Sequence, residues 1–450
     1  MDVLEIEGGV PLKGNVSVPG AKNAATKLLV ASLISDKKCT FTNMPNIAEV
    51  EATVELCEEL GMVIEWDRAN GVLVAQTKEL SSVYIHQRFS GANRIPILAI
   101  GALLGRTTQD IIVPTAGGCN IGKRPVDFHI NSLEKLGADI EYRKMKREGA
   151  YFAHAHNGLK GAVIHLNYPS VGATENTILA ACRAKGKTVI HNAAVEPEII
   201  DLILFLQKIG VIIHVDTDRT IHIHETKTFR EATHRVIPDR LQAASFGMAA
   251  IATKGRVFVE GAMQQDMVAF LNMLLRIGGG FDVHESGIEF FYDKPLSGNV
   301  VLETDVFPGF ATDWQQPFVV LLSQTEGCSI VHETVYENRF GYAETLKDMG
   351  ADVALYTECL SGKQCRFASQ NFPHSLVVKG PTPLSGGNIK IPDLRAGFAY
   401  VLAALIAPDK SALTGTHFLD RGYDHIDEKL AALGANIKRT RIVDKVAITV

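Results

Sequence analysis

The stretch EIIDLILFLQKIG, residues 198–210, has apolar residues at helical spacing and ends on a glycine. This pattern predicts an amphipathic helix that stops at the glycine. Two alternating segments, 211–215 and 220–224, flank a polar turn and predict a pair of strands. Upstream, the apolar pattern of 176–186 predicts another helix, and the β-branched run 188–190 a short strand. The expected order is helix, strand, helix, strand, strand.

The end of this pattern, an apolar helix that stops at a glycine before a short strand, occurs six times. The repeats are roughly 70 residues apart, which is the signature of a repeated supersecondary unit. The six glycines are Gly61, Gly137, Gly210, Gly278, Gly350 and Gly434. A single repeat is too small for a strong core, so we expect three repeats per domain and two domains. The polar stretch 226–240 is the expected boundary.

The composition indicates a folded protein without a strong net charge. Of 450 residues, 46% are hydrophobic and 21% are charged, with a net charge of −5. These values predict a folded chain with no global field that attracts nucleic acid or an anionic membrane. Acidic residues directly after Met1 argue against a signal peptide, and no apolar run has the length of a membrane span. We therefore expect a cytoplasmic protein.

The seven cysteines are scattered and include no C-x-x-C pair. The sequence therefore predicts neither a disulfide framework nor a zinc site, and it indicates no metal or organic cofactor. Cys39, Cys57, Cys182 and Cys328 lie in apolar strand or helix contexts, where we expect them to be inert.

The first candidate site follows a strand and a Pro-Gly turn. Lys22 and Asn23 precede an apolar helix expected to begin at about residue 24. Free N–H groups and the helix dipole at such a terminus favour an anion, and a lysine adds positive charge. The alternative is a solvated lysine at a turn.

The second candidate is the loop PTAGGCNIGKRP, residues 114–125. Its glycines allow the backbone to approach a ligand, and Cys119 stands close to Lys123 and Arg124. Nearby cations lower the pKa of a thiol and increase its reactivity. A buried structural cysteine is the alternative, and a glycine-rich loop is a poor place for one.

The third candidate is Asp313 in FPGFATDWQ, directly before an apolar helix. Asp313 is expected at the N-terminus of that helix, either as a cap alone or as part of a site. Several arginines lie in repeat openings or in loops beside glycine or acidic residues, and guanidinium groups suit bidentate capture of carboxylate and phosphate. These arginines are Arg94, Arg124, Arg339, Arg395 and Arg421.

These segments resemble the UDP-N-acetylglucosamine enolpyruvyl (1-carboxyvinyl) transferase family over essentially the whole chain. The resemblance rests on GGVPLKGNVSVPGAKNAA, GGCNIGKRPVDFH, SVGATENTILAA, EPEIID, VIPDR, FPGFATDWQ, ETVYENRF, DLRAG and LDRGYDHIDEKLAALGA. It implies an α/β fold of two inside-out barrels, each of three repeats. It also implies a C-terminal catalytic domain of 1–21 plus 239–450, with a returning N-terminal strand. The N-terminal domain, 22–238, carries the Cys119 loop as a lid.

The resemblance also implies roles for individual residues. Cys119, the loop cysteine that fosfomycin alkylates in the family, is the expected general acid, and Asp313 takes the proton of the sugar 3′-hydroxyl. The cations expected around phosphoenolpyruvate are Lys22, Arg94, Arg124, Arg395 and Arg421. The residues expected to contact UDP-N-acetylglucosamine are Asn23, Arg94, Ser170, Val171, Gly172, Asp313 and Val335.

This chain departs from the family pattern in three places. Ile95 and Pro96 replace the usual residues after Arg94, and Val195 stands where an arginine is common. The region 354–380 is longer than usual, contains two cysteines, and is interpreted as a surface elaboration. Three other functions remain open: 5-enolpyruvylshikimate-3-phosphate synthase, a transferase for another uridine nucleotide, and a catalytically silent protein that binds UDP-sugar.

Overall fold

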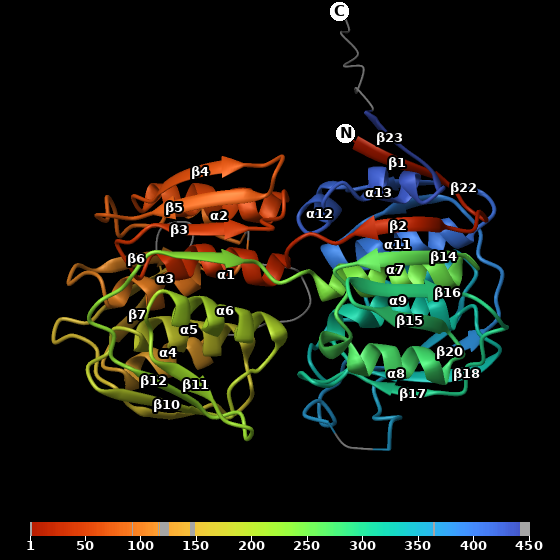
Figure 1. Ribbon diagram of the computed structural model, residues 1–450. Helices are drawn as coiled ribbons and strands as arrows, with labels where there is room; N and C mark the ends of the chain where they lie inside the picture. Colours follow the sequence, from red (N-terminus) through yellow and green to blue (C-terminus); the bar gives the residue numbers. More distant parts are fainter. Residues whose placement is uncertain are drawn as a thin grey trace, which may run out of the picture. The chain divides into compact units, whose positions relative to one another are not determined.

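The computed structural model describes residues 2–91, 93–115, 117, 126–144, 149–362 and 365–441, without the side chain of Arg395. Over these residues the chain divides into two compact domains (Figure 1). The N-terminal domain contains residues 20–115 and 126–237, and the C-terminal domain contains 2–19 and 238–441.

The N-terminal domain consists of three repeats of the expected order. The first is α1 (Lys22–Ser32), β3 (Cys39–Thr42), α2 (Ala48–Glu59), β4 (Val63–Asp67) and β5 (Val72–Gln76). The second is α3 (Ile95–Leu104), β6 (Ile111–Pro114), α4 (Asp127–Lys135), β7 (Asp139–Lys144) and β8 (Gly149–His154). The third is α5 (Val171–Ala181), β10 (Lys187–His191), α6 (Pro197–Lys208), β11 (Ile213–Val215) and β12 (Ile221–His224). Between and after them lie η1 (Gln87–Phe89), β9 (Val163–His165) and β13 (Ala232–Arg235).

The C-terminal domain repeats the plan. Its first repeat is α7 (Arg240–Ala252), β14 (Arg256–Glu260), η2 (Gln264–Asp266), α8 (Val268–Arg276), β15 (Gly280–His284) and β16 (Gly287–Phe291). Its second is β17 (Val301–Glu303), α9 (Thr312–Leu322), β18 (Gly327–His332), α10 (Ala343–Asp348), β19 (Asp352–Tyr356) and β20 (Ser375–Gly380). Its third is β21 (Asn388–Lys390), α11 (Leu394–Ile406), β22 (Lys410–Thr414), α12 (His417–Asp420), α13 (Ile426–Ala432) and β23 (Asn436–Arg441).

The N-terminal strands complete two sheets of the C-terminal domain. β1 (Asp2–Glu7) lies between β22 and β23 and pairs antiparallel with both, with Leu4 opposite Leu413. β1 therefore occupies the place that β5 occupies in the order β13-β3-β5-β4. β2 (Lys13–Ser17) pairs in parallel with β14. The last repeat thus takes its third strand from the other end of the chain.

The six repeat glycines all have the backbone conformation that ends a helix. Their φ angles lie between 87° and 107°, in the left-handed region that L side chains rarely adopt. The helix 198–209 is confirmed as α6. The helix expected over 176–186 is instead α5, which begins at Val171 after the Ser170 cap and ends at Ala181. A turn then leads to Gly186, so the glycine was a misleading end signal there.

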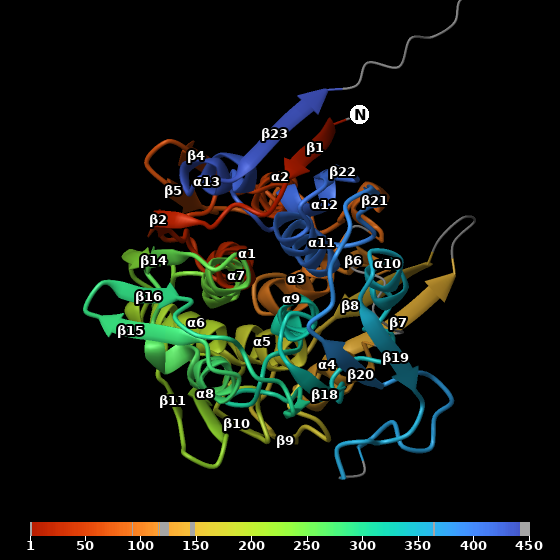
Figure 2. The same ribbon diagram turned by 90° about the vertical axis from the view of Figure 1, so that its right-hand side faces the viewer.

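The first helix of each repeat is buried, and the sheets lie outside it. In Figure 2, strands surround the helices α7, α9 and α11 of the C-terminal domain. Every residue of α3 is buried, as expected of a helix that is apolar on all sides. This arrangement, helices inside and sheets outside, confirms the predicted inside-out α/β fold.

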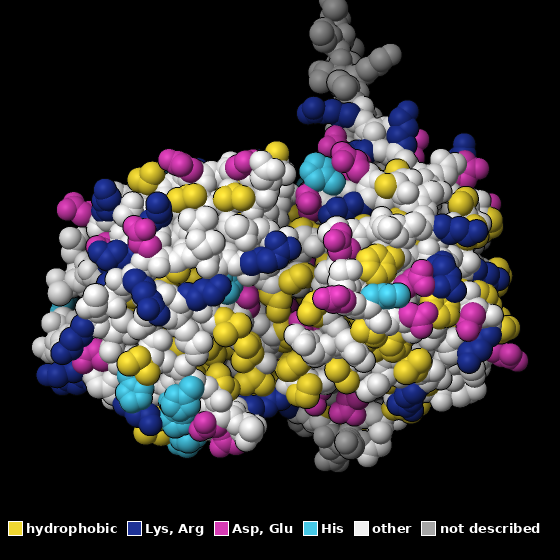
Figure 3. Space-filling model, in the orientation of Figure 1, with side chains coloured by type: hydrophobic (Ala, Val, Ile, Leu, Met, Phe, Trp, Pro, Cys, Tyr) yellow, Lys and Arg dark blue, Asp and Glu magenta, His cyan; other side chains and the backbone are white. Residues whose placement is uncertain are grey.

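The face of the molecule shown in Figure 3 is mixed in charge. Basic and acidic side chains are interspersed on this face, as the small net charge suggests. None of the described helices combines the length and apolar composition of a membrane-spanning segment.

Candidate active site

In the N-terminal domain, two helix N-termini carry predicted residues. α1 begins at Lys22, two residues earlier than expected, and its N-cap residue Ala21 has no side chain that could cap it. Lys22 and Asn23 are half-buried there. α5 begins directly after Ser170, whose Oγ accepts a hydrogen bond from the Ala173 N–H at 3.4 Å. Both termini direct backbone N–H groups outward, which suits an anion.

Arg94 belongs to a chain of polar contacts that the sequence did not reveal. It is the N-cap residue of α3, and its Nη2 lies 3.5 Å from Nε2 of His129. The other ring nitrogen of His129, Nδ1, lies 3.2 Å from Nδ2 of Asn176 on α5. Pro96 occupies the first turn of α3, where its missing N–H removes no helical hydrogen bond. The departure from the family pattern at this point is therefore compatible with the helix start.

Backbone contacts of Asn176 determine which ring nitrogen of His129 carries the hydrogen. Gly101 donates its N–H to Asn176 Oδ1 at 3.0 Å, so the amide nitrogen faces His129 and the Ile97 carbonyl. An amide nitrogen only donates, so His129 Nδ1 accepts and Nε2 carries the hydrogen. Arg94 carries only donors, so its 3.5 Å approach to Nε2 of His129 is a contact and not a hydrogen bond. Gly172 lies against the same imidazole: a Cβ there would be 3.0 Å from Cε1 of His129.

In the C-terminal domain, Asp313 is paired with a buried arginine. α9 begins at Thr312 with Ala311 as N-cap residue, so Asp313 lies inside the first turn and is not the cap. Its Oδ1 accepts a short hydrogen bond from Arg339 Nη2. The Arg339 side chain is 1% exposed and that of Asp313 is 25% exposed. Burial disfavours the Arg339 cation, but Asp313 and neighbouring carboxylates outweigh burial and raise its pKa.

Glu333 connects this pair to Val335. The buried Glu333 carboxylate accepts from the N–H groups of Val335 at 2.8 Å and Tyr336 at 3.0 Å, and from Thr312 Oγ1 at 2.9 Å. Burial raises the pKa of Glu333, and the charge of Arg339 opposes that rise. The backbone that carries Val335 is therefore fixed by the same charge cluster that holds Asp313.

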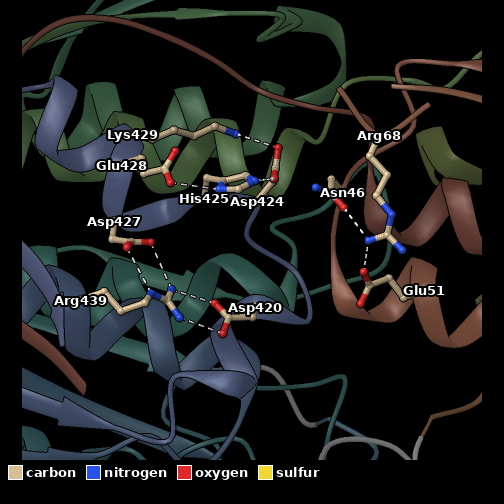
Figure 4. A network of polar contacts seen from close by, with 10 residues as sticks. All are labelled: Asn46, Glu51, Arg68, Asp420, Asp424, His425, Asp427, Glu428, Lys429 and Arg439. Carbon is tan, nitrogen blue, oxygen red and sulfur yellow. Dashed lines mark hydrogen bonds and ion pairs between the residues drawn. The ribbon is translucent and has the colours of Figure 1, made fainter. Parts of the chain in front are cut away.

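Two further predicted arginines lie at helix ends. Arg395 is in the first turn of α11. Arg421 is the C-cap residue of α12. Arg439 on β23 holds α12 through a two-pronged contact with Asp420, at 2.9 and 3.0 Å, and a second contact with Asp427 at 3.1 Å (Figure 4). Asp420 directly precedes Arg421, so this network fixes the backbone from which Arg421 projects.

Two predicted residues, Cys119 and Arg124, lie outside the described residues. Among the described cysteines, Cys39, Cys57 and Cys182 are buried, and burial raises the pKa of each thiol to about 12. This agrees with their predicted inertness. Cys328 is exposed on β18, so the expectation that it fills an apolar context was wrong.

The comparisons with known proteins decide the family. The model for EPSP synthase (3-phosphoshikimate 1-carboxyvinyltransferase) matches residues 6–430. A UDP-N-acetylglucosamine 1-carboxyvinyltransferase from Protochlamydia amoebophila (strain UWE25) is 69% identical over 437 residues, 97% of this chain and 94% of that protein. The chain belongs to the UDP-N-acetylglucosamine 1-carboxyvinyltransferase family. A Chlamydia abortus relative with the same name is 56% identical and covers 97% of this chain and 98% of its own length.

Solved structures confirm the fold of this enolpyruvyl transferase. The enolpyruvyl transferase NikO from Streptomyces tendae matches with a TM-score of 0.85 at 22% identity and covers 98% of this chain and 99% of its own. An EPSP synthase from Acinetobacter baumannii matches with a TM-score of 0.75 at 18% identity, covering 98% and 100%.

Sequence reasoning missed several residues of this transferase that the geometry brings forward. His129 stands in the quoted motif GGCNIGKRPVDFH but received no role. Asn176 stands in SVGATENTILAA, and Glu333 begins ETVYENRF. The available signal in the sequence was a polar residue within an apolar segment, such as Asn176, because a buried polar group requires a hydrogen-bond partner.

Proposed function

We propose that this protein transfers the enolpyruvyl group of phosphoenolpyruvate to the 3′-hydroxyl of UDP-N-acetylglucosamine and releases phosphate. This is the first committed step of peptidoglycan precursor synthesis. The observation that carries the proposal is the 69% and 56% identity, over nearly the whole chain, to relatives that bear this enzyme's name. The ion pair of Asp313 with the buried Arg339 supports the acceptor chemistry, because it fixes the position of a carboxylate that is still 25% exposed.

The addition step requires two proton transfers, one from the sugar hydroxyl and one to C3 of phosphoenolpyruvate, and the elimination step removes a proton from C3. Asp313 takes the proton of the sugar 3′-hydroxyl as its oxygen forms a bond to C2 of phosphoenolpyruvate. Cys119 delivers a proton to C3, which gives a tetrahedral adduct. C3 then loses a proton while the bond between C2 and the phosphate oxygen breaks. Each positioned acid or base contributes about 10²–10⁴-fold to the rate.

Cations and helix N-termini hold the two anionic substrates in this proposal. Lys22, Arg124, Arg395 and Arg421 take the phosphate and carboxylate of phosphoenolpyruvate, with Arg94 nearby. Such fixed charges also stabilise the charged adduct. The residues assigned to the UDP-sugar are Asn23, Arg94, Ser170, Val171, Gly172, Asp313 and Val335. The backbone N–H groups at the start of α5 and the Arg94 cation support a phosphate-binding role there.

Closure of the Cys119 loop over the substrates excludes water, which would otherwise hydrolyse the adduct. The proposal retains a catalytic domain of 1–21 plus 239–450 and a lid-bearing domain of 22–238. Both substrates are small metabolites, so we expect the enzyme to act in the cytoplasm.

Phosphate release tests the proposal. Purified protein is incubated with phosphoenolpyruvate and either UDP-N-acetylglucosamine, shikimate-3-phosphate or no acceptor. We expect release only with UDP-N-acetylglucosamine, and a large loss in Cys119→Ala and Asp313→Asn but not in the control Cys328→Ala. Release with shikimate-3-phosphate instead would refute the acceptor assignment. Binding of UDP-N-acetylglucosamine without phosphate release would favour the silent protein.

A further inference from the structure

Four potential metal ligands meet at one end of the sheet β17-β18-β20-β19. His332 ends β18, His374 directly precedes β20, and Cys359 and Cys365 lie in the loop after β19. Their ligand atoms all lie within 4.8 Å of one another. Strand register creates the meeting point, because His332 is opposite Ser375 in the β18–β20 ladder.

Two separations among these atoms match a tetrahedral zinc site. The two Sγ atoms are 3.7 Å apart, and Cys359 Sγ is 3.4 Å from His374 Nε2. Zn–S bonds of about 2.3 Å and Zn–N bonds of about 2.0–2.1 Å at the tetrahedral angle require about 3.8 Å between sulfurs and about 3.5 Å between sulfur and nitrogen. The two sulfurs and His374 Nε2 thus have separations that fit ligands of one ion, and His332 lies within the same 4.8 Å group.

The tautomer of His332 leaves a lone pair directed at the cluster. Ser375 Oγ donates its hydrogen to the Glu358 carbonyl at 2.6 Å and accepts from the Leu360 N–H at 3.2 Å. Its remaining contact, 2.8 Å from His332 Nδ1, must therefore be an acceptance from that ring N–H. Nε2 of His332 then carries the lone pair, and this buried atom has no hydrogen-bond partner among the described residues. The whole His332 residue is 0% exposed.

His374 is prepared in the same way. Its Nδ1 lies 3.0 Å from the Phe372 carbonyl, which only accepts, so Nδ1 carries the hydrogen and Nε2 faces Cys359 with its lone pair. Ligating histidines in proteins usually donate their second ring N–H in this manner. In addition, the Phe367 N–H donates to Cys365 Sγ at 3.3 Å, and the Phe367 ring packs against His374. Both cysteines are half-buried, and both histidines are 0% exposed.

We propose that His332, Cys359, Cys365 and His374 bind one structural zinc ion. Two thiolates and two imidazoles form the closed four-ligand set typical of structural zinc, and each thiol releases one proton when the metal binds. A Cys359–Cys365 disulfide is the competing interpretation. It would leave the buried Nε2 of His332 without a function, and the observed sulfur separation is not that of a bond.

The zinc site also has a consequence for substrate binding, and that consequence rests on the proposed function. The loop that carries the cysteines places Arg366, whose Nε donates to the Thr334 carbonyl at 3.1 Å and whose Nη2 contacts the Val335 carbonyl. Val335 is an assigned UDP-sugar contact. Zinc would therefore hold the loop whose Arg366 contacts the backbone of Thr334 and Val335. The region 354–380 is accordingly more than a surface elaboration.

Metal content tests the site without reference to activity. Tag-free protein from zinc-supplemented medium is expected to contain one zinc per chain by elemental analysis. Cys359→Ser/Cys365→Ser is expected to lose it. The matched control His214→Gln/His222→Gln, which removes an exposed surface cluster of histidines with Asp216, is expected to keep it. Cobalt(II) in place of zinc should give tetrahedral visible absorption and a thiolate charge-transfer band.

Ser375→Ala keeps all four ligands and provides a test that survives if the cysteine variant fails to fold. We expect it to lower zinc affinity about 10–100-fold, because it releases the orientation of His332. Wild-type protein without zinc, a Cys359–Cys365 disulfide in peptide mapping, or zinc retained by the folded cysteine variant would each overturn the proposal. In the transferase assay, zinc loss should raise the KM for UDP-N-acetylglucosamine severalfold. If no acceptor supports phosphate release, the proposed function fails while the metal result stands.

Discussion

The buried charge cluster of the C-terminal domain gives a quantitative prediction. Arg339→Met removes the cation that lies between Asp313 and the buried carboxylate of Glu333. The backbone N–H groups and the hydroxyl that Glu333 accepts from remain, so the loss is one of charge compensation. Removal of one partner from a buried ion pair costs about 3–5 kcal/mol, because the other charge stays buried.

The pH dependence of this loss has a defined sign. Burial already raises the pKa of Glu333, and removal of the Arg339 cation raises it further. A carboxyl whose folded pKa exceeds its unfolded value, about 4.3 for glutamate, contributes stability below the unfolded value. That stability is lost as the pH rises through the folded pKa. The stability difference between wild type and Arg339→Met should therefore be larger at pH 8 than at pH 5.

Urea unfolding followed by tryptophan fluorescence measures this difference. The chain has two tryptophans, Trp66 and Trp314, and Trp314 lies buried in the C-terminal domain. In a Trp66→Phe background, fluorescence reports on that domain. We expect the unfolding midpoint of Arg339→Met to fall by about 1 M or more.

Two further variants make the reasoning refutable. Arg339→Met/Glu333→Gln should recover part of the loss, with a coupling of about 0.5–3 kcal/mol. The exposed pair of Arg256 with Glu289 is the control, and Arg256→Met should cost less than about 1 kcal/mol at either pH. Additive losses for Arg339 and Glu333, or a loss in Arg339→Met that is the same at both pH values, would show that charge burial is not the cause.

Three other variants probe the remaining contacts. Gly101→Ala would bring a Cβ to 2.3 Å from Oδ1 of Asn176 and should destabilise the N-terminal domain by about 1–3 kcal/mol, measured by Trp66 fluorescence. Gly172→Ala gives a milder contact, 3.0 Å from its Cβ to Cε1 of His129. We expect stability to stay nearly unchanged and the KM for UDP-N-acetylglucosamine to rise. Arg439→Met releases α12, so the KM for phosphoenolpyruvate should rise more than kcat falls; unchanged steady-state constants would count against its positioning role.

The repeats could be predicted because their signals are local. Each repeat has an apolar helix followed by a glycine, and the glycine is needed where the chain turns with positive φ. Where the helix ends several residues before the glycine, the predicted helix end was wrong. Gly186 lies five residues beyond the end of α5, so the helix was placed too late. The motif around Asp313 predicted the start of α9 to within two residues, but the N-cap residue is Ala311 and not Asp313.

The contacts that bring distant side chains together could not be read from the sequence. His129 and Asn176 are separated by 47 positions and meet only because α4 packs against α5. His332 reaches the loop cysteines through the register of β18 with β20. The absence of a C-x-x-C pair predicted no zinc site, because that rule covers ligands close in sequence. Ligands contributed by a strand and a long loop leave no such spacing.

The placement of the site residues follows from the repeated architecture. Lys22, Arg94 and Gly172 lie at or beside the starts of the first helices α1, α3 and α5. Asp313 holds the equivalent place on α9. A helix start favours negative charge, so in the proposed function the first three starts suit the substrate anions and the fourth suits the negative charge of the Asp313 side chain. The same local feature of the repeat therefore accounts for the places of both the proposed anion-binding residues and the proposed base.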